Sequence, residues 1–206
     1  MVESTLIAEP PAPAAAAAPA SPAGVRRRLF TVAEFERMAE VGILAHQERV
    51  ELIEGEIVQM SPVGSPHAAC VNRLNALFHK GLGDRVVVIV QNPIHLGERS
   101  EPEPDVALAQ PRPDFYEAGH PGPADLYLVV EVMETSAGYD RQVKLPLYAR
   151  AGIAELWLVD LAGRLVEVHR RPLGGQYAEK RTVTPGQTLA PEAFPEVVFA
   201  VEAILG

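Results

Sequence analysis

The chain has 206 residues, of which 48% are hydrophobic and 22% charged, and its formal net charge is −9. This length suits one sizeable α/β domain better than two. The negative charge argues against a protein held on nucleic acid mainly by neutralising phosphates, although an acidic metal site with local basic spots can still position a strand.

The N-terminal part is rich in Pro and Ala and has few large apolar side chains. We therefore predict a disordered tail over residues 1–28 and a folded domain over residues 29–206. The tail lacks the basic leader and apolar centre of a signal peptide. No stretch approaches the roughly 20 apolar residues that span a bilayer, so we expect no membrane span and a cytoplasmic location.

The first elements expected after the tail are a helix and a hairpin. Thr31-Val32-Ala33-Glu34 has the form of a capping box, which predicts a helix ending near Gly42. Residues 49–60 alternate around Glu54-Gly55, which predicts a β-hairpin. The acids of this hairpin could form a solvated face, or one could turn inward.

A longer helix is expected next, over residues 66–81. Apolar residues recur there at helical spacing, after Ser65 as N-cap and Pro66 at the first helical position. His67 lies in the first turn, and a surface histidine is the favoured interpretation over a site residue. Cys70, the one cysteine, is interpreted as a packed small side chain.

Three strands are expected in the middle of the chain. Residues 86–90 form an almost continuous apolar run, which is typical of a strand buried on both faces. Asp105 leads into a second strand, over residues 106–109. The strongest pattern covers residues 126–132, where Glu131 interrupts the apolar run near the carboxyl end, and open sheets place ligands at such ends.

The remaining pattern predicts one more helix and several strands. Asp140 is expected to cap a helix that runs to Arg150, with Gly152 as its stop. Pro146 inside it implies a kink or a later start. Strands over residues 155–160, 165–169 and 177–183 and an apolar segment at 197–201 complete an α/β domain whose mixed sheet has antiparallel edges.

Asp105, Glu131 and Lys144 form the candidate site. Acids in or beside strands are rarely buried unless they are paired or bind a metal. Magnesium prefers carboxylate oxygens, and a nearby lysine could hold a water molecule or a phosphate, as phosphodiester hydrolysis requires. The alternatives to a site role are that Asp105 caps a turn and that Lys144 is a solvated helix residue. No GxSxG elbow, P-loop, GxGxxG or HExxH motif is present.

Several short segments also occur in an order that is specific as a set. Together they resemble the Uma-two (Uma2) family of putative restriction-endonuclease-like proteins, within the PD-(D/E)xK nuclease superfamily. The resemblance covers about residues 30 to 204. Its segments are residues 49–56, Ser61-Pro62 with His67, residues 104–106, residues 128–132, Asp140-Arg141 with Lys144 and Tyr148, and residues 151–160.

This resemblance implies a restriction-endonuclease-like fold, with a central mixed β-sheet flanked by helices. It implies an endonuclease that binds Mg²⁺ or Mn²⁺ through Asp105 and Glu131, with Glu51 as a further metal ligand. The superfamily places its lysine two residues after the second acid, where this chain has Met133. Lys144 is then the candidate for a lysine that has moved to the next helix.

We therefore hypothesise a magnesium-dependent endonuclease acting on DNA, with Asp105, Glu131 and Lys144 as catalytic residues. The sequence leaves the choice between DNA and RNA open. The rival hypothesis is a non-catalytic member of the fold that serves as an interaction module, which the acidic charge and Met133 favour slightly. By analogy with nucleases that cut two strands as dimers, we also consider a homodimer.

Overall fold

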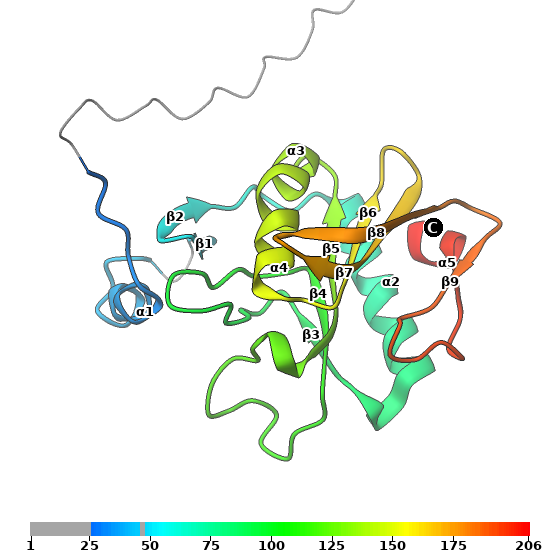
Figure 1. Ribbon diagram of the computed structural model, residues 1–206, viewed down its shortest axis with the longest axis horizontal. Helices are drawn as coiled ribbons and strands as arrows, with labels where there is room; N and C mark the ends of the chain where they lie inside the picture. The colour runs from blue at the N-terminus through cyan, green and yellow to red at the C-terminus, as the bar shows by residue number, and fades with distance from the viewer. Residues whose placement is uncertain (1–25, 46–47) are drawn as a thin grey trace, which may run out of the picture.

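The computed structural model of the chain describes residues 26–45 and 48–206 (Figure 1). The predicted disorder of the tail therefore concerns residues that lie almost entirely outside the described part. At its end, Arg27 forms an ion pair with Glu56 at 2.9 Å, and Arg28 pairs with Glu34. These contacts attach the start of the described chain to the folded domain.

The centre of the fold is a six-stranded sheet in the order β3-β4-β5-β6-β7-β8. β5 and β6 are parallel and the other neighbours are antiparallel, so the predicted mixed α/β sheet is confirmed. A parallel pair needs a crossover connection, which the helical segment after β5 supplies. The strands are β3 (Val87–Val90), β4 (Val106–Ala109), β5 (Leu126–Met133), β6 (Glu155–Asp160), β7 (Leu165–Leu173) and β8 (Gln176–Val183).

The prediction that residues 86–90 are buried on both faces holds only in part. β3 lies at the edge of the sheet, beside β4, and within the strand only Ile89 is buried. Its apolar residues still touch both layers, because Val88 and Val90 pack on one core cluster and Val87 on the other. A continuous run of β-branched residues is therefore also compatible with an incompletely covered edge.

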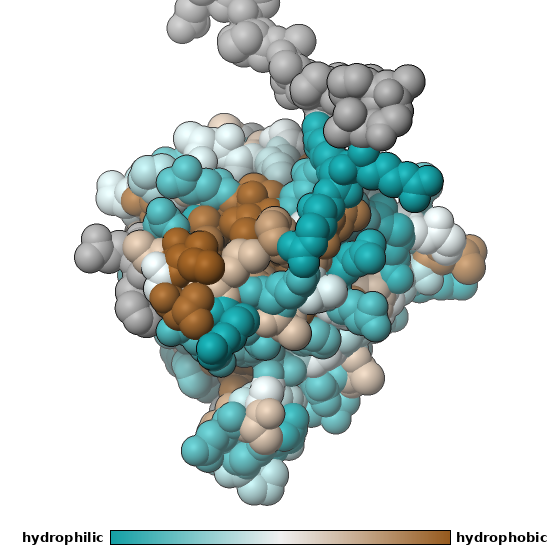
Figure 2. Space-filling model, turned by 90° about the vertical axis from the view of Figure 1, so that its left-hand side faces the viewer, coloured by the Kyte–Doolittle hydropathy of each residue, from teal (hydrophilic) through white to brown (hydrophobic). Residues whose placement is uncertain are grey.

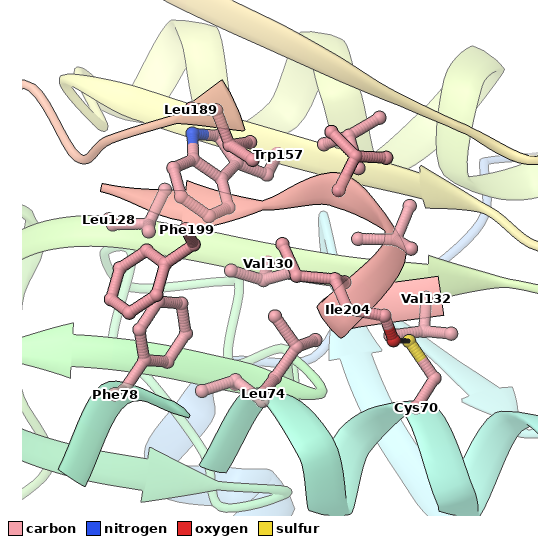
Figure 3. Packing of buried hydrophobic residues seen from close by; sticks show 14 of the residues in the cluster. Cys70, Leu74, Phe78, Leu128, Val130, Val132, Trp157, Leu189, Phe199 and Ile204 are labelled. Carbon is pink, nitrogen blue, oxygen red and sulfur yellow. Dashed lines mark hydrogen bonds between the residues drawn. The ribbon is translucent and has the colours of Figure 1, made fainter. Parts of the chain in front are cut away.

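Helices cover both faces of the sheet. On one face, α2 (Ser65–Leu82) and α5 (Val201–Leu205) pack against a cluster in which Leu74, Val130, Trp157 and Ile204 are fully buried (Figure 3). Fully burying one such apolar side chain stabilises the fold by about 1.5–3 kcal/mol. The other face carries a second cluster that includes Tyr148 of α4 (Leu145–Ala151). Trp157 is thus a core residue.

The elements before α2 match their predictions. α1 (Val32–Glu40) starts at the capping box of Thr31 and Glu34. β1 (Val50–Ile53) and β2 (Glu56–Gln59) form the antiparallel hairpin. Its turn residues, Glu54 and Gly55, have φ angles of 50° and 85°, which tight hairpin turns require. A bridge between Leu52 and Glu101 attaches the hairpin to the loop that leads into β4.

Helix α2 begins one residue earlier than predicted, and its N-cap is Gly64 rather than Ser65. A Cβ atom on Gly64 would lie 2.5 Å from Oε2 of Glu134, so a side chain at this position would displace the Glu134 carboxylate. Glu134 thereby approaches the start of α2, where the helix dipole favours negative charge.

The helical segment after β5 differs from its prediction at Asp140. The segment consists of α3 (Ala137–Tyr139), a π-helical turn, η3 (Asp140–Lys144), and α4. Asp140 is therefore inside the segment and does not cap it. Pro146 falls in the first turn of α4, where its missing amide is tolerated, and the wide η3 turn precedes it. The segment ends at Gly152, whose φ of 83° is left-handed, as predicted.

The C-terminal apolar segment folds back onto the α2 face as a strand and a helix. β10 (Phe199–Ala200) pairs with β9 (Thr188–Leu189) and leads directly into α5. Short 3-10 helices, η1 (Gly83–Arg85) and η2 (Pro123–Asp125), complete the elements. Across the described residues, we find no helix that could cross a membrane. Figure 2 shows the side that carries α1 and the hairpin, where hydrophobic side chains gather beside a hydrophilic strip.

Candidate active site

A cavity of about 300 Å³ lies where the hairpin, the start of α2, the start of β4, the end of β5 and the η3 turn meet. Acidic side chains dominate its charge. Five carboxylates, but only one lysine and one arginine, line it: Glu51, Asp105, Glu131, Glu134 and Asp140, with Lys144 and Arg49. This surplus of negative charge favours a cation inside the cavity.

Asp105 and Glu131 come from neighbouring strands. Val106 of β4 pairs with Val130 of β5, so continuing this antiparallel register places Asp105 opposite Glu131. The backbone amide of Val132 donates to Oδ2 of Asp105 at 2.8 Å, and the side-chain amide of Gln91 donates from Nε2 to Oδ1 at 3.3 Å. Asp105 is therefore held in one orientation at the edge of the cavity, as a site residue requires.

Glu131 points from β5 toward the α4 side of the sheet because side chains alternate along a strand. It is 3% exposed. Its Oε1 accepts from Nζ of Lys144 at 3.1 Å and from the Tyr148 hydroxyl at 2.5 Å. Burial raises the pKa of Glu131 to about 8, against the opposing effect of the Lys144 charge. Without a further cation, this carboxyl is thus poised to hold a proton near neutral pH.

Lys144 lies between two carboxylates. Its Nζ is 3.1 Å from Oε2 of Glu51 and 3.1 Å from Oε1 of Glu131, and the side chain is 4% exposed. Burial lowers the pKa of Lys144, but Glu131, Glu51 and Asp140 outweigh this effect and raise it above its ordinary value. The lysine is therefore charged. The prediction that Lys144 reaches the carboxylates is confirmed.

Met133 lies two residues after Glu131 and is a core residue. Its side chain is 1% exposed and belongs to the core cluster under α4. A lysine there would have to bury its charge among apolar side chains. Arg141 of the η3 turn pairs with Asp160 at 2.8 Å and with Glu167 at 3.0 Å. These ion pairs attach the η3 turn, which carries Lys144, to the sheet.

The structure brings Glu51, Asp105, Glu131 and Lys144 to one cavity, as the sequence led us to expect. Their catalytic and metal-binding roles stay predictions. Of the two interpretations of the hairpin acids, the inward one holds for Glu51, which is 2% exposed, whereas Glu56 is exposed. Oε2 of Glu51 also accepts from the backbone amide of Glu103 at 3.3 Å.

His67 is not the surface histidine that was expected. Its Nε2 lies 3.0 Å from Oδ2 of Asp105, and its side chain is 13% exposed. The hydrogen bond to Asp105 raises the pKa of His67. Position in the first turn of a helix does not show which way a side chain points, so the sequence carried no signal beyond the neighbouring Ser61-Pro62 motif.

Tyr148 and Asp140 are two further site residues whose role the sequence did not indicate. Tyr148 is fully buried in the second core cluster, and its hydroxyl donates to Glu131. Asp140 is buried, accepts from the Ser136 hydroxyl and has its pKa raised by burial. The acid at the start of a predicted helix resembled a cap, and only the η3 geometry turns it toward the cavity.

The donor set fits a hydrated hard cation better than a closed metal cage. In residues 26–45 and 48–206, no cluster of three or more His, Cys, Asp or Glu side chains is arranged to hold a metal ion. Lys144 lies between Glu51 and Glu131, which leaves Asp105 and Glu131 as the adjacent pair. Magnesium keeps several waters and commonly uses one or two carboxylates, so this pair is chemically suitable.

Comparison with known proteins finds a family model and solved structures that are similar to this chain. A family model described as a putative restriction endonuclease, Uma2, matches residues 32–202. A crystal structure of a putative nuclease belonging to DUF820 from Anabaena variabilis superposes with a TM-score of 0.65 at 17% identity. The alignment covers 85% of this chain and 97% of that one. At this identity the likeness shows the fold. Among curated proteins no relative matches the chain.

Proposed function

We propose a nuclease function from one premise: the chain belongs to the Uma2 family of putative restriction endonucleases, whose model matches residues 32–202. The family and the nuclease-like fold support a nuclease. We propose more specifically a metal-dependent endonuclease that hydrolyses phosphodiester bonds of DNA.

One observation carries this proposal. The ammonium of Lys144 lies 3.1 Å from Glu131, and Asp105 lines the same cavity from the neighbouring strand. Two acids on adjacent strands with one lysine are the groups that metal-assisted phosphodiester hydrolysis needs. A purely structural ion pair would not require a cavity with surplus carboxylates around it.

Asp105 and Glu131 would hold the metal ion, with Glu51 beside them. When bound, Mg²⁺ or Mn²⁺ supplies a Lewis acid that polarises the phosphoryl oxygen and makes a bound water more acidic. Lys144 would stabilise negative charge on the phosphate or orient the attacking water. Tyr148 and His67 orient the two acids, since each contacts one of them.

The test combines metal binding with DNA cleavage by the full chain. We expect calorimetry to show Mn²⁺ binding to the wild type in the millimolar range or tighter, and weaker or no binding to Asp105→Asn. Supercoiled plasmid should be nicked with Mg²⁺ but not with chelator. Asp84→Asn is the matched control, because Asp84 is exposed and does not line the cavity.

Two results would contradict the proposal. A wild type that binds neither Mg²⁺ nor Mn²⁺ at millimolar concentration would leave the mechanism without its metal and support the non-catalytic interaction module. Nicking that survives both Asp105→Asn and Glu131→Gln would come from a contaminating nuclease. A single-stranded RNA in the same assay tests the preference for DNA, and light scattering tests the homodimer.

A further inference from the structure

One lysine and one arginine line the cavity, and among the described residues only the lysine forms ion pairs. Lys144 is buried between Glu51 and Glu131. Arg49 lines the same cavity and is half-buried. Within residues 26–45 and 48–206, its guanidinium has no ion pair within 4.0 Å and no side-chain hydrogen bond. Its charge is therefore available to a ligand.

The backbone holds Arg49 at this position. Arg49 directly precedes β1, and its carbonyl accepts from the amide of Met60 at 2.8 Å, which extends the hairpin ladder by one pair. The Arg49 charge is felt at two neighbours. Burial raises the pKa of Glu103, and Arg49 opposes that rise. The hydrogen bond to Asp105 raises the pKa of His67, and Arg49 opposes that rise too.

A half-buried guanidinium without a protein partner keeps only part of its hydration, so an anionic ligand would be a favourable partner for it. Carboxylates are close by, yet none of them pairs with Arg49 in the described chain. The planar fork of arginine matches two oxygens of a phosphate group. A phosphodiester that enters this acidic cavity also needs a positive group that has no carboxylate partner. Lys144 is already paired with Glu51 and Glu131.

We propose that Arg49 binds a phosphate group of the nucleic-acid strand beside the Asp105–Glu131 pair. The ligand class is a phosphodiester, and the guanidinium donates to its non-bridging oxygens. This inference rests on the proposed nuclease function, because it places substrate in the same cavity. It assigns to Arg49 a contact with substrate and leaves the metal to the carboxylates.

The test measures binding of a short fluorescent DNA duplex by anisotropy, with the full chain and with chelator present, so that binding is separated from cleavage. Arg49→Gln should weaken binding about 10-fold and reduce the slope of log affinity against log salt by about 1, as expected for one lost phosphate contact. Arg49→Lys should recover part of the affinity as a point charge. Arg171→Gln removes the same charge from an exposed site outside the cavity and should change affinity less than about 2-fold, as a charge without a phosphate contact would.

Either of two binding results would overturn this assignment: a wild type that binds no duplex, or an Arg49→Gln variant with wild-type unfolding that keeps wild-type affinity and salt slope. The proposed nuclease function fails separately. A wild type that binds duplex through Arg49 but does not cleave it with Mg²⁺ would refute the nuclease and support the phosphate contact. A wild type that cleaves DNA, with Arg49→Gln unchanged in KM and salt dependence, would refute the contact alone.

Discussion

Two glutamates on adjacent parallel strands are both buried, yet they have different surroundings. Glu131 of β5 is 3% exposed and Glu155 of β6 is 0% exposed. Burial raises the pKa of both. Glu155 accepts from Trp157 at 2.8 Å, from Arg170 at 2.7 Å and from the backbone amide of Glu192 at 2.6 Å. Each of its oxygens has a donor, and the cavity lies elsewhere.

Glu131 is in the opposite situation. It shares one ammonium with Glu51, and the charges of Asp105 and Asp140 raise its pKa further. It also lines the cavity. The comparison teaches that a buried acid in a strand does not by itself mark a site. The distinguishing features are a surplus of carboxylates over cations and access to a cavity.

The largest expected effect is the loss of plasmid nicking when Glu131 is replaced. Glu131→Gln should lower the rate of plasmid nicking by at least about 100-fold, since losing a group behind a metal ligand already costs 10–100-fold. Folding should hold, because the amide oxygen can still accept from Lys144 and Tyr148. The checks are initial rates and urea unfolding. A large loss of stability with normal activity per folded molecule would place Glu131 in the same class as Glu155.

Glu155→Gln should lower stability and leave the activity of the folded protein unchanged. Its amide cannot accept from all of the present donors, so a buried donor is left unsatisfied and the free energy of unfolding should fall by about 2 kcal/mol. Nicking per folded molecule should stay at the wild-type rate. Urea unfolding and initial rates measure both quantities. If activity fell as far as in Glu131→Gln, the proposed distinction between the two acids would be wrong.

A third expected effect is a pH dependence of stability. The pKa of Glu131 rises from an ordinary value of 4.5 to about 8 in the folded chain. Between these values the folded state binds more protons than the unfolded state, so the free energy of unfolding should fall as pH rises. Unfolding in chelator should show a shallower fall for Glu131→Gln than for the wild type. Equal slopes would show that Glu131 carries no raised pKa.

Local patterns predicted most elements of the fold. The capping box at Thr31, the turn at Glu54-Gly55 and the strand around Glu131 each depend on neighbours in the sequence, and all three are confirmed. β3 is less completely buried than predicted because it lies at the edge of the sheet, and its apolar run does not show whether another strand lies beside it. Asp140 was misjudged because an acid before a helical pattern looks alike as a cap and as part of a π-helical turn.

For the site, the order of motifs was enough to select Asp105, Glu131 and Lys144. The same motifs contain Arg49, His67 and Tyr148, but their contacts could not be assigned because side-chain direction and pairing are not local properties. Apolar patterns alone do not separate Glu155 from Glu131, since each begins or interrupts an apolar strand, and it was the resemblance to the Uma2 family that selected Glu131. Their different partners come from β7 and from the helical segment after β5.

The sequence alone therefore determined the strands, the turns and the acids that apolar runs cannot accommodate, since these follow from spacing along the chain. Tertiary structure decided which acid received its own donors and which shared a single ammonium. The physical reason is that solvation and pairing of a charge depend on every group within a few ångströms, and most of those groups are distant in sequence.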